Sequence, residues 1–335
     1  MKLLTGKRLK AWVKWLISVL LLLAVLAACL FMVFENNKQA IELQWSNRIV
    51  NQIPAFGSTQ TLSILPLVNW HTKNTSLQGE AGVSYLIKTD QHTILFDVGF
   101  NRNQSSPSPL EHNMQQLNVE ISDIDTIFLS HAHLDHNGGQ SWVNKQTFSM
   151  GLQQADLSHS NIYAPTPTNY PGVHVNIIPN ATVIGEGVAS LGAISRQLLM
   201  GKIQEQALVI KLAGKGLVVI VGCGHQSVPK ILDQVKRVFD EPIYGVVGDL
   251  HYPVPNGRLN LMGINLQRVF ASGEGPHSPI TFEDMQQEMN LLKQAGVQFM
   301  ALGAHDTSDE VIEYVSEHFT NNYHYVRVGD RINVQ

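Results

Sequence analysis

The pattern of apolar and polar residues divides the chain into an N-terminal apolar segment and a long region of short, alternating elements. Residues 16–34, LISVLLLLAVLAACLFMVF, carry no charge. Nineteen residues are about the length of helix that crosses the hydrocarbon core of a bilayer. From residue 61 onward, short apolar runs alternate with Gly, Asp and Asn, which is typical of β-strands joined by turns. The first predicted strands cover residues 61–70, 83–89, 93–99 and 124–130.

Strands and helices alternate again in the second half of the chain. A Gly-Lys-Gly turn in QALVIKLAGKGLVVIVGCG, residues 206–224, predicts a pair of strands. A helix beginning near residue 307 is predicted from Thr307 and Glu310, which have the spacing of a capping box. A run of strands and helices followed by a second such run favours two sheet-plus-helix halves packed together. The remaining strands are predicted at 243–250, 297–304 and 323–328, and the helices at 108–118, 227–239, 281–296 and 307–319.

Two segments lack a regular pattern. Residues 150–180 contain the Pro-rich run YAPTPTNYPG, and residues 252–280 are long, irregular and rich in Gly and Pro. A loop of that length in a compact domain usually has a function, often as a lid or substrate loop. We therefore expect both segments to shape a pocket, with His277 as a candidate substrate contact.

The residues before the apolar segment predict its orientation. Residues 1–15 carry five basic residues and no acid, so they are expected to stay in the cytoplasm and the rest of the chain to lie outside. An uncleaved single-pass anchor in the cytoplasmic (inner) membrane is favoured, with the globular part periplasmic or extracellular. The sequence LAAC also has the form of a lipoprotein cleavage box with Cys29 lipidated, and a cleaved secretory signal is the third alternative. The predicted organisation is residues 1–15 cytoplasmic, 16–34 transmembrane, 35–60 stalk and 61–335 globular domain.

Composition excludes some classes of protein. An apolar content of 44% and a charged content of 15% fit a globular domain with a substantial core. The net charge is −4, and no basic run follows residue 15, which argues against a nucleic-acid partner. Cys29 and Cys223 are the only cysteines, so the outer domain is expected to form no internal disulfide. Nothing in the composition indicates the oligomeric state.

Three of the 14 histidines lie within one stretch, LSHAHLDHNGG at residues 129–139, directly after a predicted strand, whereas the others are scattered along the chain. His131 and His133 are two apart, so in extended chain both side chains point the same way and can reach one ion. If the chain then turns, Asp135 and His136 can reach a neighbouring point. Imidazole and carboxylate are ligands for zinc, iron or manganese, and Asp135 is also expected to orient a reacting water.

A two-metal site needs further ligands from distant positions, and strand ends are where such residues meet. His225, His251 and His305 each follow an apolar strand and a Gly-containing turn. Asp249 lies two residues before His251 and can act either as a ligand itself or as the group that orients His251. Asp97 also ends a strand. Beside a metal cluster, it is expected to accept a hydrogen bond from a ligating histidine.

These motifs resemble the metallo-β-lactamase superfamily. The spacing of FDVG, SHAHLDHNGG and the later strand-end histidines is similar to that of its dihydropteroate-synthase-like branch. The branch pattern corresponds to PLEHNMQQLN, GCGH, GDLH and GAHD in this chain, over roughly residues 60–310. The resemblance implies an α/β fold, an αββα sandwich with metals at one edge, here preceded by the transmembrane helix. It implies Asp97 as a supporting residue, and as metal-site candidates His131, His133, Asp135, His136, His225, His251 and His305.

Two departures from the branch pattern affect the expected ligands. Asp249 stands where the branch usually has glycine, which leaves open whether Asp249 or His251 is the ligand. The sequence GAHD lacks the usual His-Cys-Thr-Gly ending, so the surroundings of His305 are expected to differ from those in the branch.

The resemblance and the histidine pattern together favour a metal-dependent hydrolase that acts on a small-molecule substrate. Two divalent cations, zinc before iron or manganese, would activate water against an ester, lactone, amide or phosphoester bond. One alternative is a transferase of the dihydropteroate-synthase-like type that uses the same site. The other is a membrane-anchored sensor that binds metal without turnover. Fold and metal site do not determine the substrate.

Overall fold

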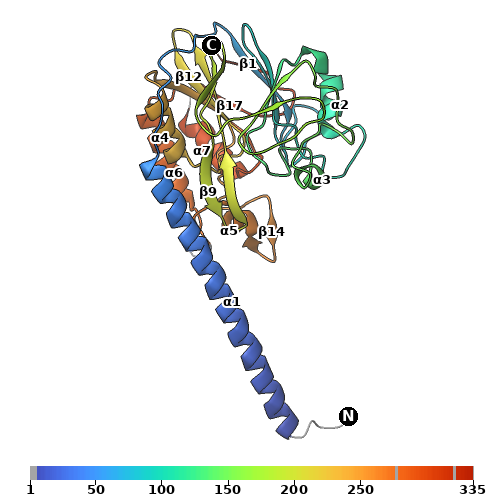
Figure 1. The fold of residues 1–335 in the computed structure, drawn as a ribbon, viewed down its shortest axis with the longest axis vertical. Coiled ribbons are helices and arrows are strands. Elements are labelled where there is room, and N and C mark those ends of the chain that lie inside the picture. Colours follow the sequence, from blue (N-terminus) through green and yellow to red (C-terminus); the bar gives the residue numbers. More distant parts are fainter. Residues whose placement is uncertain (1–5, 276–277, 320–321, 335) are drawn as a thin grey trace. The chain divides into compact units, whose positions relative to one another are not determined.

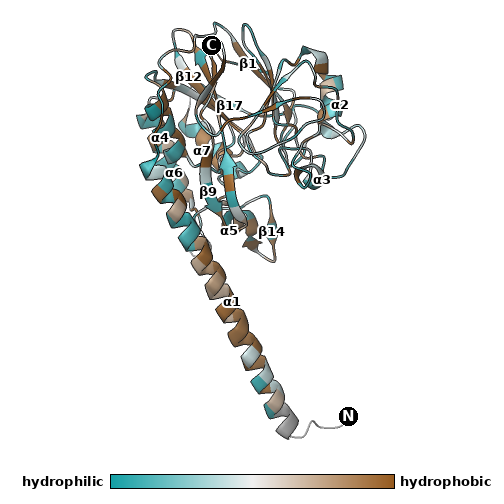
Figure 2. Ribbon diagram, in the orientation of Figure 1, coloured by the Kyte–Doolittle hydropathy of each residue, from teal (hydrophilic) through white to brown (hydrophobic). Residues whose placement is uncertain are grey.

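The computed structural model of the chain describes residues 6–275, 278–319 and 322–334. The chain forms two compact units, Met1–Arg48 and Ile49–Gln335. The first unit is a single helix, α1 (Gly6–Asn47), which includes the predicted apolar span and continues into the predicted stalk (Figure 1). Apolar residues fill the middle of α1 and hydrophilic residues lie toward its ends (Figure 2). By length and composition, this helix is able to cross a membrane.

The second unit contains two seven-stranded sheets (Figure 1). The strands of the first sheet are β1 (Leu62–Val68), β2 (Ser84–Lys88), β3 (Thr93–Phe96), β4 (Thr126–Phe128), β5 (Asn161–Ala164), β6 (Val175–Ile177) and β18 (Ile332–Val334). Their order across the sheet is β18-β1-β2-β3-β4-β5-β6. Strands β1 to β3 pair in antiparallel fashion, whereas β3 to β6 are parallel, so β3 and β4 end at the same edge.

The second sheet joins the C-terminal half of the chain. Its strands are β7 (Thr182–Gly185), β8 (Val188–Ser190), β11 (Leu208–Leu212), β12 (Gly216–Val221), β13 (Ile243–Gly248), β16 (Phe299–Leu302) and β17 (Tyr323–Tyr325). They lie in the order β17-β16-β13-β12-β11-β8-β7. The predicted Gly-Lys-Gly turn joins β11 to β12 as an antiparallel pair. Strands β12, β13 and β16 are parallel, so their C-terminal ends share one edge.

The two sheets pack face to face through one buried apolar cluster. Ile64 and Phe96 enter it from the first sheet, and Ile220 and Val247 enter it from the second. Because side chains alternate across a strand, each sheet also has an outer face that must be covered. Helix α2 (Pro109–Gln116) covers the first sheet, and α4 (Val228–Val238), α6 (Phe282–Gln294) and α7 (Asp309–His318) cover the second (Figure 1). The predicted αββα sandwich is therefore confirmed.

The ends of the helices follow from local sequence, with one exception. Ser108 and Glu111 form a capping box at α2, and Thr281 and Asp284 form one at α6. The predicted capping role of Thr307 is wrong, because Ser308 caps α7 and accepts a hydrogen bond from the Val311 N–H. The two residues are adjacent, and sequence spacing alone did not separate them.

Several short elements lie where the pattern predicted no regular structure. Strands β9 (Ile194–Leu198) and β10 (Gly201–Glu205) form a separate hairpin. Within the predicted loop 252–280, β14 (Asn260–Leu261) and β15 (Ile264–Asn265) form a second small hairpin, followed by α5 (Leu266–Ala271). These elements are short, so neither has a hydrophobic period long enough to read from sequence. The two remaining short helices are α3 (Gln140–Val143) and η1 (Ile121–Asp123).

Candidate metal centre

The predicted histidines meet where four strands end. The cluster at residues 131–136 follows β4, and His225, His251 and His305 follow β12, β13 and β16. Within the cluster, the Asn137 amide donates hydrogen bonds to the carbonyls of His131 and His133 at 2.7 and 2.9 Å. This amide therefore fixes the turn that presents the two imidazoles.

The imidazole rings lie close together. The centroids of His131 and His136 are 4.0 Å apart, and those of His225 and His251 are 4.5 Å apart. His133 lies 4.9 Å from His225 by the same measure. The resulting sets of potential ligand atoms, each within 4.8 Å of one another, are His131, His133 and His225; Asp135, His136 and His305; Cys223, His225, His251 and Asp306; and His131, His136 and Cys223.

Several buried ring nitrogens in this centre have no hydrogen-bond partner among the residues that the structure describes. They are the Nε2 atoms of His131, His136, His225 and His251, and both ring nitrogens of His305. A buried polar atom without a partner costs roughly 1–3 kcal/mol. Five such rings converging on one region is the arrangement expected when divalent cations accept their lone pairs. The residues present therefore fit a metal centre.

Burial sets the charge state of most of these rings. It lowers the pKa of His131 and His225 well below the usual range, and that of His136 to about 4, with neighbouring histidines adding to the effect. A neutral imidazole is the form that binds a metal. For His305, burial lowers the pKa, but Asp306 and Asp135 outweigh it and the net pKa is raised.

The structure places Asp97 directly beneath His136. Its Oδ2 lies 2.6 Å from His136 Nδ1, and its two oxygens also accept hydrogen bonds from the N–H and hydroxyl of Ser130 at 2.7 and 2.6 Å. Burial raises the pKa of Asp97, and the two Ser130 hydrogen bonds act in the opposite direction. With Nδ1 engaged by a carboxylate, His136 presents Nε2 to the centre.

Asp249 and His251 occupy different positions. The Asp249 carboxylate accepts hydrogen bonds from the N–H groups of Leu250, His251 and Asp306, and from the Thr307 hydroxyl. Its oxygens are outside the sets of potential ligand atoms found among the described residues, whereas His251 is inside one. The geometry thus makes Asp249 a support. It holds His251, whose φ of 56° is uncommon for a residue other than glycine.

Three residues of the centre were not predicted. Glu205 accepts hydrogen bonds from the N–H groups of Cys223, Gly224 and His225 at 2.9, 3.0 and 2.7 Å, and so holds the loop that carries His225. Burial raises its pKa to about 7. The Cys223 thiol donates to Asp306 Oδ2 at 2.6 Å, and the same oxygen lies 3.1 Å from His251 Nδ1.

Sequence signals for these three residues differ. Asp306 directly follows His305, and a His-Asp pair at the end of a strand is a sequence signal that could have indicated Asp306 as a residue of the centre. Cys223 precedes His225 in GCGH and directly follows an apolar strand, where a lone cysteine predicts a core or site-lining residue and no particular ligand. Glu205 lies in the run KIQEQAL, where nothing distinguishes it from a surface acid.

A hollow of about 560 Å³ opens at the metal centre. His133, Asp135, His225, His305 and Asp306 form its floor. The loop segment predicted to shape the pocket contributes Arg258, Leu259, Leu266, Gln267, Phe270 and Ala271, and the remaining wall residues are Trp70, Ala81, Phe100, Arg102, Leu134 and Met200. Residues 150–180 are absent from this lining, and His277 lies outside the described residues.

Comparison with known proteins bears on the fold and on the segment that carries the histidine cluster. The family model of the metallo-β-lactamase superfamily matches residues 77–148, which contain Asp97 and the histidine cluster. A crystal structure of a metal-dependent hydrolase of the β-lactamase superfamily is similar with a TM-score of 0.53 and 19% identity, over 82% of this chain and 99% of that one. The metallo-β-lactamase fold protein YhfI from Bacillus subtilis has a TM-score of 0.48 and 13% identity, over 82% and 100%.

One curated relative carries the name of a synthase. The 7,8-dihydropterin-6-methyl-4-(β-D-ribofuranosyl)-aminobenzene-5′-phosphate synthase of Methanocaldococcus jannaschii is 22% identical over 225 residues, which are 53% of this chain and 73% of the relative. The expected resemblance to the metallo-β-lactamase superfamily is confirmed by the family model and the fold. The narrower likeness to the dihydropteroate-synthase-like branch stays a prediction.

Proposed function

Because this chain has the metallo-β-lactamase fold, we propose that it is a membrane-anchored hydrolase with a two-metal centre. The observation that carries the proposal is the set of buried, unpartnered imidazole nitrogens at the floor of an open hollow. A structural metal site is closed by four protein ligands, whereas a catalytic site leaves a position for water or substrate. The opening above His133 and Asp135 favours catalysis over metal sensing.

Two sets of residues would hold the ions. His131, His133 and His225 would hold one, and Asp135, His136 and His305 the other, with zinc the first expectation from this donor set. His251, Cys223 and Asp306 lie beside both sets. Two divalent cations held there would lower the pKa of a bound water and would polarise the carbonyl or phosphoryl group whose carbon or phosphorus that water attacks.

The chain's own residues position the reaction. Asp135 faces the hollow with its side chain 23% exposed, so one carboxylate oxygen can accept a proton from the attacking water while the residue stays in its ligand set. Asp97 and Asp249 fix His136 and His251 from behind. For an ester or lactone, water adds to the carbonyl carbon, the C–O bond breaks, and the alcohol leaves with the proton, giving an acid and an alcohol.

The test uses the full chain in detergent with generic ester, lactone and phosphodiester substrates. Hydrolysis is expected only in metal-loaded enzyme and is expected to fall at least 1,000-fold in the double variant His131→Ala, His133→Ala. The matched control is His92→Ala, which removes a histidine on the loop between β2 and β3, outside the centre. Full activity in a metal-free double variant would contradict the proposal.

A synthase is the second candidate, because the curated relative is a synthase. The two reactions differ in their products, since a hydrolase consumes water and yields two fragments whereas a synthase joins two molecules. Mass spectrometry of a reaction run in ¹⁸O-labelled water distinguishes them. Label in the acid product supports hydrolysis, and an unlabelled condensation product supports the synthase.

A further inference from the structure

An apolar edge surrounds the mouth of the hollow. It consists of Met200 at the tip of the β9–β10 hairpin, Leu259, Leu261, Met262 and Ile264 on and around the β14–β15 hairpin, and Phe270 on α5. Met262 is 94% exposed and Met200 is 68% exposed, so these side chains contribute little to the core. In Figure 1, the β9 hairpin, α5 and β14 project together from the same end of the domain.

The apolar edge is continuous with the candidate metal centre. Met200, Leu259 and Phe270 line the same hollow as His133 and His225. An apolar chain lying along the edge would therefore reach the ligand residues without crossing a polar rim. Exposed apolar patches next to a site usually mark a binding surface.

The charge near the apolar edge is basic. Between His251 and Gly273 the sequence contains no acidic residue. Arg258 is occupied by Asp309 and the carbonyls of Ala304 and Thr307. The β14–β15 hairpin and α5 thus offer apolar contact without an acid of their own that would repel an anionic interface.

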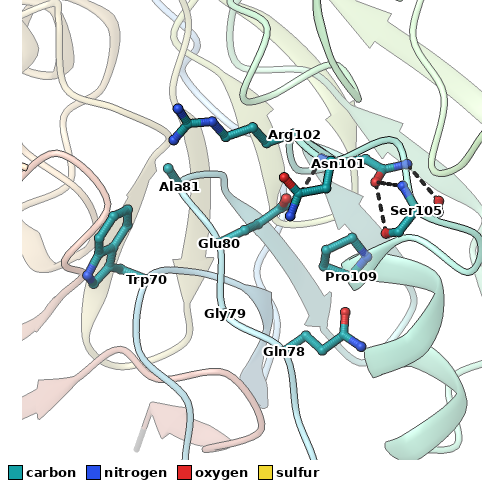
Figure 3. Close-up of a pocket in the computed structure, with 10 residues that line it drawn as sticks. Trp70, Gln78, Gly79, Glu80, Ala81, Asn101, Arg102, Ser105 and Pro109 are labelled. Carbon is teal, nitrogen blue, oxygen red and sulfur yellow. Dashed lines mark hydrogen bonds between the residues drawn. The ribbon is translucent and has the colours of Figure 1, made fainter. Parts of the chain in front are cut away.

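A cation also lines the hollow. Arg102 lines this hollow and also a second hollow of about 560 Å³ beside it, which shares Trp70 and Ala81. Figure 3 shows the Arg102 guanidinium turned toward Ala81 and away from the hydrogen bonds that join Asn101 and Ser105. Among the residues that the structure describes, no carboxylate forms a salt bridge with Arg102. It is free to bind an anionic group.

We infer that the substrate is an amphiphile taken from a lipid bilayer. The inference rests on the proposed function, since it names the substrate class of that same site. The apolar chain lies against Phe270 and Leu266, the anionic group binds Arg102, and the scissile bond lies over the metal ligands. The β14–β15 hairpin rests on the bilayer surface and inserts Met262.

A lipid bilayer is the surface that this chain itself brings close to the apolar edge. Helix α1 is long and apolar enough to cross a membrane, and a domain tethered in this way is held near lipid at high effective concentration. A second copy of the chain is the other candidate to cover the apolar edge, and the fluorescence experiment distinguishes it from a bilayer.

Docking is tested by fluorescence in the full chain. On a Cys29→Ser background, Met262→Cys carries an environment-sensitive fluorophore, while Cys223 is buried and stays unlabelled. The matched control is Leu152→Cys, an exposed apolar position 48% accessible and outside the apolar edge. Both proteins are reconstituted in vesicles of phosphatidylcholine with phosphatidylglycerol, so α1 tethers each label equally.

The inference requires a blue-shifted emission at position 262 that lipid-attached quenchers suppress, together with a water-like emission at position 152. Water-like emission at both positions overturns it. A third outcome is a blue shift at position 262 that lipid-attached quenchers do not suppress and that disappears when the protein is diluted in the vesicles. This result shows that a second copy of the chain covers the apolar edge, and it also overturns the inference.

Chain-length selectivity tests the substrate class. Burial of one methylene group on the apolar edge increases the binding affinity about fourfold. The kcat/KM for octanoyl esters is therefore expected to be at least tenfold higher than that for acetyl esters. Phe270→Ser is expected to lower this ratio. An equal rate for both esters overturns the inference but leaves the proposed function standing, whereas loss of all metal-dependent hydrolysis contradicts the proposed function. The fluorescence result does not depend on turnover.

Discussion

The orientation of His136 depends on a carboxylate that has no access to solvent. Asp97 is fully buried, takes two hydrogen bonds from Ser130 and holds His136 Nδ1 at 2.6 Å. This arrangement leaves Nε2 as the only ring nitrogen of His136 that can face the centre. Such supporting carboxylates typically contribute 10- to 100-fold to metal affinity.

Replacement of Asp97 by Asn tests this role. The amide keeps the size of the side chain but turns an N–H₂ toward a histidine N–H, so His136 loses its acceptor. Metal affinity is expected to fall about 10- to 100-fold, measured by competition with a chromophoric chelator. The control is Asp156→Asn, an exposed acid far from the centre in sequence and outside every ligand set of the described residues. Equal affinity in the two variants would mean that Asp97 does not support the centre.

Sequence spacing predicted most of the candidate ligands, but it did not predict every residue that supports them. The cluster at 131–136 is local, so its spacing alone indicated metal chemistry. His225, His251 and His305 could be predicted from the sequence, because each follows an apolar run that indicates a strand. Glu205 could not be predicted in this way. Its role depends on a tertiary contact, because the β9–β10 hairpin brings it under the loop 223–225, and no local pattern encodes that contact.

At the scale of elements, two strand-end loops must approach closely to build the centre. Gly224, at a φ of +90°, lies in the loop after β12, and a Cβ there would be 2.5 Å from the Leu250 Cα in the loop after β13. These loops carry His225 and His251. Glycine is therefore needed both for its backbone conformation and for the close approach.

Gly224→Ala is expected to weaken both the fold and the metal centre. Gly172→Ala is the matched control, because Gly172 also has a positive φ, of +71°, but no atom within 4 Å of its added Cβ. Both substitutions should lower the free energy of unfolding by about 1–2 kcal/mol through the left-handed backbone. Only Gly224→Ala should lose more and bind metal weakly, as followed by urea unfolding and metal titration. Identical losses would show that the close approach is unimportant.

The regular elements were predictable for a physical reason. Strands such as β12 and β13 are buried on both faces and read as continuous apolar runs, and α4 and α6 have clear apolar stripes and end signals. The short strands between residues 161 and 205 have no such pattern, since each is three to five residues long. Their pairing is decided by tertiary contact.

At the scale of the whole molecule, the fate of the N-terminal helix distinguishes three models. A single-pass anchor keeps α1, a lipoprotein loses the residues before Cys29, and a secreted protein loses the whole segment. Because the apolar run of residues 16–34 is longer than the apolar region of a typical secretory signal, we expect the anchor.

Cys29→Ser tests these alternatives. An uncleaved anchor predicts that wild type and variant have the same full-length mass and both stay in the membrane after alkaline carbonate extraction. The readouts are intact-mass spectrometry and immunoblotting of the fractions. A lipid adduct present only in wild type would assign the lipoprotein, and a shortened soluble product in both would assign cleavage.

The buried imidazoles are proposed to hold two metal ions. Elemental analysis of the full chain by inductively coupled plasma mass spectrometry, after purification without chelators, measures this directly. Two equivalents of a divalent transition metal per chain are expected in wild type and in His92→Ala, falling below half an equivalent in the double variant His131→Ala, His133→Ala. A metal-free wild type that cannot be loaded with zinc, iron or manganese, or a double variant with undiminished metal, would contradict the account.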